Sequence, residues 1–120
     1  MYQDWPKIAQ DMTGVVRDLR GGAPDVMKSF SALARAALDG TALDAKTKEL
    51  IALGISVAVR CDACVAFHAE AAVKRGATRE EVLEAMGMAV YMGAGPSVMY
   101  AAQAVEAFEQ FRARATAEKA

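Results

Sequence analysis

Two cysteines and the single histidine of the chain stand close together in the sequence, as Cys61, Cys64 and His68. On an α-helix, this spacing places the three side chains on one face, and Cys64 and His68 become i, i+4 neighbours. Two thiols one turn apart near a helix N-terminus can form a disulfide, and the positive end of the helix dipole favours the thiolate. A neighbouring imidazole can accept the proton of Cys64 and stabilise the thiolate. The spacing therefore predicts thiol redox chemistry.

Glu49 is the nearest upstream carboxylate that stands within an apolar run. In one straight helix, Glu49 and Cys61 would lie about 18 Å apart and point in different directions. If the chain reverses near Arg60, Glu49 and His68 fall within about one helical turn of each other on two neighbouring helices. The sequence therefore predicts that Glu49 orients or protonates His68, provided that this turn forms. Taken alone, Glu49 is typical of a solvated helix residue.

Other interpretations of these residues stay open. Cys61, Cys64, His68 and Glu49 together offer four ligands to zinc. Structural zinc sites usually draw ligand pairs from two separate elements, however, and the chain has no second Cys or His pair. The protein could instead be a redox-responsive binding protein that uses the disulfide as a switch without turnover. It could be a lactone-type decarboxylase, which would not need the thiols. The cysteines could also be inert members of the core. The spacing favours redox chemistry, with no bound metal expected.

Helical spacing of apolar residues recurs along the chain, and no stretch alternates apolar and polar residues over the length of a strand. Asp44 can cap one helix, and Thr78 and Glu81 form a capping box for another. We therefore expect an all-α domain of about six helices. They run from Trp5 to Gly21-Gly22, from Pro24 to Gly40, from Asp44 onward, through the cysteines to Lys74-Arg75, from Thr78 to about Met92, and onward from a break at Gly93–Pro96.

Residues 85–102 carry no charge, but Gly93, Gly95 and Pro96 interrupt them and leave two halves too short to span ~30 Å of hydrocarbon. We expect two buried helix segments there. A pocket for an apolar substrate beside Tyr91 and Tyr100 is a weaker alternative to simple core filling. The side chains expected in the core are Met86, Met88, Met92, Val98, Met99, Ala101, Val105 and Phe108.

Hydrophobic residues make up 54% of the chain, and the formal net charge is −1. A short chain that is so apolar is expected to bury part of its surface against further copies of itself. The balanced charge offers no basic patch that would bind nucleic acid. The N-terminus has neither the basic start nor the apolar run of a secretory signal, so we expect a cytoplasmic protein with no membrane partner. The sequence has no flavin or nicotinamide fingerprint, so a redox cycle must draw its electrons from an external dithiol or a protein reductant.

The combined spacing of these residues resembles the carboxymuconolactone decarboxylase superfamily, and within it the alkylhydroperoxidase D-like branch. The resemblance covers roughly residues 25–110. The matching signature is Glu49, eleven intervening residues, Cys61-Asp62-Ala63-Cys64 and Val65-Ala66-Phe67-His68, followed by Ala71-Ala72-Val73-Lys74-Arg75-Gly76-Ala77-Thr78 and Glu80-Glu81-Val82.

The resemblance implies one all-helical domain over 1–120 that assembles as a homo-trimer or hexamer and reduces hydroperoxides through thiols. It assigns Cys64 as the thiolate that attacks the peroxide, Cys61 as the resolving thiol, and His68 with Glu49 as the proton relay. One departure is Ala63, which stands where the best-studied members carry a second histidine. Around the core at about 25–110 we expect an N-terminal helix at 1–20 and a polar tail at 112–120.

Overall fold

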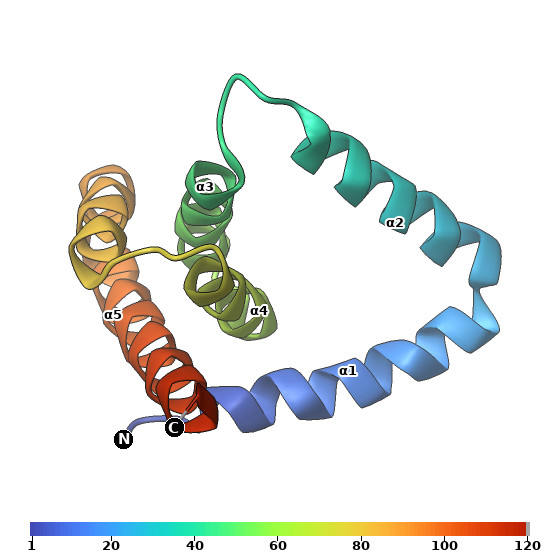
Figure 1. The fold of residues 1–120 in the computed structure, drawn as a ribbon, viewed down its shortest axis with the longest axis horizontal. Coiled ribbons are helices and arrows are strands. Elements are labelled where there is room, and N and C mark those ends of the chain that lie inside the picture. Colours follow the sequence, from blue (N-terminus) through green and yellow to red (C-terminus); the bar gives the residue numbers. More distant parts are fainter. Residues whose placement is uncertain (120) are drawn as a thin grey trace.

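The computed structural model describes residues 1–119, and five helices and no strand occur among them (Figure 1). The all-α prediction is confirmed. The helices are α1 (Trp5–Gly22), α2 (Pro24–Asp39), α3 (Ala45–Ala58), α4 (Asp62–Lys74) and α5 (Arg79–Lys119). The polar tail expected at 112–120 continues α5 as far as Lys119, and Ala120 lies outside the described residues.

The helix starts expected from capping residues are confirmed. The Asp44 carboxylate accepts a hydrogen bond from the Thr47 amide at 2.8 Å and caps α3. At the start of α5, the Thr78 amide donates to Glu81 Oε1 at 2.8 Å, and the Glu81 amide donates to Thr78 Oγ1 at 3.1 Å. These reciprocal bonds satisfy backbone donors that have no partner within the helix.

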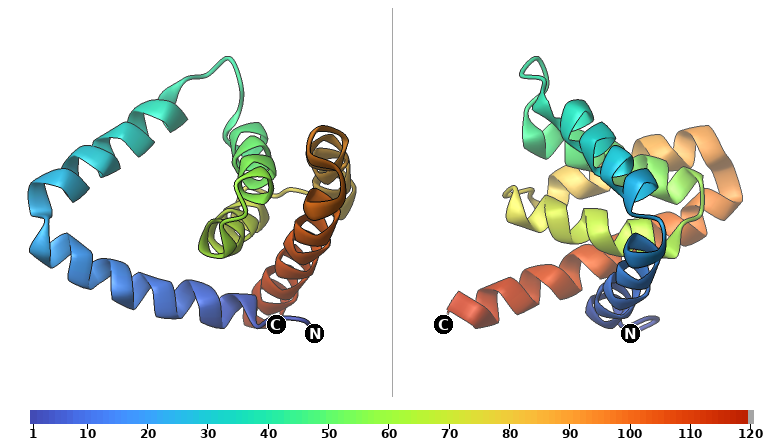
Figure 2. Two further views of the ribbon diagram at one scale, coloured as in Figure 1. Left: turned by 180° about the vertical axis from the view of Figure 1, so that it is seen from behind. Right: turned by 90° about the vertical axis from the view of Figure 1, so that its right-hand side faces the viewer.

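The fifth and sixth expected helices form the single element α5, which bends within the expected break (Figure 2). Ala94 has non-helical backbone angles, φ 55° and ψ −141°, and Pro96 follows it. A Cβ at Gly93 would come within 1.8 Å of the Ser97 hydroxyl, so this close approach requires glycine. The prediction of six separate helices is therefore not confirmed, although the backbone does depart from helical geometry where the sequence predicted.

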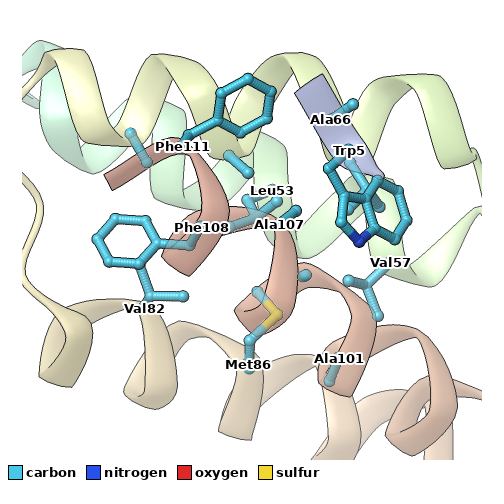
Figure 3. Close-up of a cluster of buried hydrophobic side chains, with 14 of the residues drawn as sticks. Trp5, Leu53, Val57, Ala66, Val82, Met86, Ala101, Ala107, Phe108 and Phe111 are labelled. Carbon is cyan, nitrogen blue, oxygen red and sulfur yellow. The ribbon is translucent and has the colours of Figure 1, made fainter. Parts of the chain in front are cut away.

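The core lies between α3, α4 and α5, and the first turn of α1 closes one end of it. Figure 3 shows the indole of Trp5 in the same cluster as Leu53, Val57 and Phe108. Because Trp5 is fully buried, its ring N–H requires a partner, and it donates to Glu106 Oε2 at 3.0 Å. This bond fixes the start of the chain to the C-terminal half of α5.

The helix α2 contributes no buried residue, although its sequence carries an apolar face. Figure 1 shows α1 and α2 as an arm that leaves the body, so that α2 lies apart from α3 and α4 for most of its length. Val26, Phe30 and Leu33 are each more than half exposed. The core predicted for α5 also includes side chains that are not buried. Met86, Ala101 and Phe108 are buried and Val105 is partly buried, as predicted. Met88, Met92, Val98 and Met99 are exposed.

Apolar periodicity cannot distinguish a helix face that packs within its own chain from one that is free to meet another molecule, which explains these errors. None of the helices in the described part of the chain has an apolar stretch of the length required to cross a membrane.

Candidate active site

The chain reverses between α3 and α4 at Arg60, as the predicted contact between Glu49 and His68 requires. Arg60 adopts the left-handed conformation, with φ 57°. Its amide donates to the Val57 carbonyl at 3.2 Å, and the Cys61 amide donates to the Ser56 carbonyl at 3.1 Å. These are the two hydrogen bonds of a Schellman motif, in which the left-handed residue is usually glycine. The motif ends α3 and places Cys61 directly at the start of α4.

Cys61 and Cys64 form a disulfide at the N-terminal end of α4. Cys61 is the N-cap residue, and its sulfur accepts a hydrogen bond from the Cys64 amide at 3.2 Å. Both cysteines are half-buried, so the sulfurs lie neither in the core nor fully in solvent. An N-cap position gives a sulfur an amide donor and the positive end of the helix dipole, which together favour a thiolate when the pair is reduced.

His68 lies one turn further along α4 than Cys64, and its Nδ1 lies 3.0 Å from Glu49 Oε1 on α3. The predicted contact is confirmed. Glu49 is only 8% exposed, so the view of it as a solvated residue is wrong. An ionised carboxylate can only accept, so an ionised Glu49 in this contact would favour the neutral His68 tautomer that carries its proton on Nδ1 and a lone pair on Nε2. The His68 side chain is 37% exposed, so the imidazole is not closed off from solvent.

Asp62, between the two cysteines, is held by two other parts of the chain. Gln3 Nε2 donates to Asp62 Oδ2 at 3.4 Å. On α5, the interaction of the Tyr100 hydroxyl with the Asp62 carboxylate raises the pKa of Tyr100, and burial and the negative charge of Asp62 add to the effect. The start of α4 is therefore tied to both the N-terminal segment and α5.

A pocket of about 440 Å³ opens beside Glu49 and His68. Its walls come from α2 and α3 and are mostly aliphatic, and its other lining residues are Ala34, Ala37, Leu38, Leu43, Lys48, Ile51, Ala52 and Ile55. Such a pocket, with a few polar groups at one side, suits a small organic molecule.

A second apolar groove of about 520 Å³ lies between α3 and α5, where Met88 and Met92 line it. Neither Tyr91 nor Tyr100 lines either pocket.

No group of three or more His, Cys, Asp or Glu side chains is placed to hold a metal ion within residues 1–119. The four residues considered for zinc instead form two pairs, the disulfide of Cys61 with Cys64 and the hydrogen bond of His68 with Glu49. This arrangement can move protons at one pair beside a sulfur redox centre at the other.

Lys48 was not among the residues predicted from the sequence. Its ammonium lies 3.2 Å from the carbonyl oxygens of Ala37 and Leu38 and 2.8 Å from that of Gly40, at the end of α2. The last turn of α2 has no basic residue of its own, although a helix ends in carbonyl groups without intrahelical partners. That absence was a signal that a neighbouring cation would cap this end.

Comparison with known proteins supports the relationship that the signature suggested. Residues 24–107 match the family model described as the carboxymuconolactone decarboxylase family. An apo crystal structure of a member of this family from Legionella pneumophila is 53% identical, with a TM-score of 0.88 over 90% of this chain and 96% of that chain. A Thermotoga maritima member, for which a role in antioxidative response has been suggested, is 29% identical, with a TM-score of 0.80 over 95% of this chain and 97% of that chain.

An uncharacterised protein of Haemophilus influenzae is 38% identical over 108 residues, which cover 90% of this chain and 96% of that protein. An uncharacterised protein of Cupriavidus necator is 39% identical over 90 residues, which cover 75% of this chain and 80% of that protein. The match of sequence and fold extends over most of the molecule. This chain belongs to the carboxymuconolactone decarboxylase family.

Proposed function

We propose that the protein is a thiol-dependent peroxidase that reduces organic hydroperoxides through Cys61 and Cys64. The observation that carries this proposal is the hydrogen bond between His68 and Glu49, one helical turn from the disulfide. A general base beside a thiol, oriented in turn by a carboxylate, is the arrangement that activates sulfur nucleophiles. The suggested antioxidative role of the Thermotoga maritima relative agrees with this chemistry.

In the first step, Nε2 of His68 removes the proton of the Cys64 thiol while Nδ1 remains bonded to Glu49. The thiolate attacks the terminal peroxide oxygen and the O–O bond breaks. Cys64 becomes a sulfenic acid, and the leaving alkoxide takes the proton from His68 to depart as an alcohol. The sulfur is oxidised by two electrons and the peroxide is reduced by two.

In the second step, the Cys61 sulfur attacks the sulfenic acid, the S–O bond breaks, and water leaves as the disulfide forms. The structure holds this disulfide, with Cys61 at the helix N-cap. An external dithiol or protein reductant then opens it by thiol–disulfide exchange, and its own two thiols are oxidised to a disulfide. The role of Cys64 as first nucleophile rests on its i, i+4 position relative to His68.

The experiment that tests this proposal mixes the reduced protein with cumene hydroperoxide and a dithiol, and follows peroxide loss together with free thiols. The parent should turn over repeatedly, and Cys64→Ser should lose at least a hundredfold in rate, as expected for removal of a nucleophile. If Cys64→Ser consumes peroxide as fast as the parent, the proposed function is wrong. If the parent forms one disulfide that no dithiol reduces, the pair is a redox switch instead.

We also propose that the protein works as a homo-oligomer, a trimer or a hexamer. Exposed large apolar side chains on α2, α3 and α5 support this, among them Phe30, Leu33, Ile55, Met88 and Met92. So many apolar side chains on one small chain are typical of a surface that another subunit covers. Light scattering coupled to gel filtration gives the subunit number directly, and a single subunit at micromolar concentration would disprove the assembly.

A further inference from the structure

The side chain of Lys48 joins α3 to the end of α2. Its Nζ is within hydrogen-bonding distance of three carbonyl oxygens, those of Ala37, Leu38 and Gly40, at 3.2, 3.2 and 2.8 Å. An ammonium has three donors, so the group can be fully satisfied there. Its positive charge also faces the negative end of the α2 dipole. We call this arrangement the Lys48 clasp.

The clasp matters because little else in the same subunit holds α2 in place. The helix buries no residue, and its other polar side-chain contact within residues 1–119 is the 3.3 Å bond from Arg20 on α1 to Ser31. Segments with few buried apolar contacts open at low free energy. Within one subunit, the position of the C-terminal half of α2 therefore depends on Lys48.

This half of α2 forms one wall of the pocket beside the proton relay. Ala34, Ala37 and Leu38 line that pocket opposite α3, and Glu49 and His68 stand at its polar side. Lys48 is itself a lining residue and directly precedes Glu49 in α3. Two adjacent residues of α3 therefore have different parts in the pocket. Glu49 is the relay carboxylate, and Lys48 sets the distance between α3 and the wall formed by α2.

We propose that the Lys48 clasp positions α2 as the wall that binds the organic group of the hydroperoxide, and so makes Lys48 a positioning residue for substrate choice. The inference rests on the proposed peroxidase function and adds the determinant of its substrate range. A bulky aromatic or alkyl hydroperoxide needs both walls in place, because its apolar group gains binding free energy from contact with each. Hydrogen peroxide has no such group and does not need the wall.

The test compares Lys48→Met with the parent, using cumene hydroperoxide and hydrogen peroxide as substrates. Methionine keeps an unbranched apolar stem of similar length but loses the ammonium. The matched control is Lys46→Met on the same helix, because the ammonium of Lys46 pairs with Glu81 on α5 at 2.8 Å. For Lys48→Met we expect KM for cumene hydroperoxide to rise about five- to tenfold with kcat nearly unchanged. The kcat/KM for hydrogen peroxide should stay within about twofold of the parent.

An equal loss with both peroxides, or an unchanged KM for cumene hydroperoxide, would overturn the positioning role. Hydrogen exchange of the α2 amides, measured on the same variants, tests the clasp without reference to catalysis, and exchange should be faster in Lys48→Met than in Lys46→Met. Unchanged exchange would disprove the clasp itself. If the parent consumes neither peroxide while exchange in α2 is faster in Lys48→Met, the proposed function fails and the clasp stands.

Discussion

The hydrogen bond between His68 and Glu49 gives each side chain a distinct part in the proposed reaction. Glu49 is almost fully buried and can only accept when ionised, so in the proposed reaction it selects the imidazole nitrogen that carries the proton. His68 is partly exposed and keeps its second nitrogen for the reacting thiol. Ala63, the residue before Cys64, has no proton to transfer, so one base must serve both the thiol and the leaving alkoxide.

Replacement of Glu49 by glutamine tests this division of roles. The amide keeps the size of the side chain, but its NH₂ group can donate to Nδ1 and hold His68 in the wrong tautomer. We expect Glu49→Gln to slow oxidation of the reduced thiols by cumene hydroperoxide about ten- to a hundredfold, within the range of general-base contributions. Stopped-flow measurement of thiol loss gives this rate.

The control for that experiment is Glu84→Gln, which changes an exposed carboxylate on α5. Its thiol oxidation rate should match that of the parent. A rate for Glu49→Gln equal to that of this control would show that the carboxylate does not orient the base.

At the level of elements, the α3–α4 hairpin brings the two halves of the site together through a strained residue. Arg60 takes the left-handed conformation that Gly76 takes at the end of α4, where the same pair of hydrogen bonds recurs. A side chain in this conformation costs about 1 kcal/mol or more relative to glycine. The cost of this turn is offset because the turn lets Cys61 cap α4 and lets the apolar faces of α3 and α4 pack into the core.

Substitutions at the two turns should therefore change the free energy of unfolding in opposite directions. Arg60→Gly should raise the free energy of unfolding by about 0.5–1 kcal/mol, because glycine adopts this conformation without strain. Gly76→Ala should lower it by about 1 kcal/mol for the converse reason. Urea unfolding followed by circular dichroism measures both, and a stability loss in Arg60→Gly would contradict the assignment of strain to this turn.

The parts of the fold that follow from local chemistry could be predicted from the sequence. The caps at Asp44 and Thr78 needed only the residue types and their spacing. The Glu49–His68 contact was predicted only as a condition, because no glycine marks the reversal at Arg60. Burial of Glu49 and the Lys48 clasp depend on the relative placement of helices, which residue spacing alone does not determine.

At the level of the whole molecule, Glu106 joins the start of the chain to its last helix. Its carboxylate accepts hydrogen bonds from Trp5 Nε1 and from the Tyr2 and Gln3 amides. Burial raises the pKa of Glu106, but these hydrogen bonds outweigh that effect and leave the pKa below its ordinary value of 4.5. The folded state therefore binds this proton less readily than the unfolded chain does.

A lowered pKa in the folded state stabilises the protein above pH 4.5, and this contribution disappears as the pH falls through the folded-state pKa. We expect Glu106→Ala to lower the free energy of unfolding at pH 7 by about 1–2 kcal/mol, partly because the Trp5 N–H stays buried without a partner. Its stability should then fall less steeply than that of the parent below pH 4.5. The control Glu118→Ala, at an exposed site near the end of α5, should change neither quantity.

The exposed apolar face of α2 offers a test of the proposed assembly, because a charge placed on this face should weaken contact with another subunit. Leu33 lies on this face, whereas Arg35 lies on the opposite face of the helix. If another subunit covers the apolar face, Leu33→Glu should lower the mass measured by light scattering, because it buries an unpaired charge in the interface. Arg35→Glu should leave the mass unchanged. An identical mass for both variants and the parent would show that α2 is not in the interface.

The measurement that bears most directly on the central claim is chemical trapping of the first oxidised sulfur. The variant Cys61→Ser lacks the resolving thiol, so a sulfenic acid formed by attack on peroxide persists. After one equivalent of cumene hydroperoxide and treatment with dimedone, mass spectrometry of the digested protein should locate one adduct, on Cys64. The adduct should form in Cys61→Ser and be absent from Cys64→Ser. An adduct on Cys61 in Cys64→Ser together with an unmodified Cys64 in Cys61→Ser would contradict the role of Cys64 as first nucleophile.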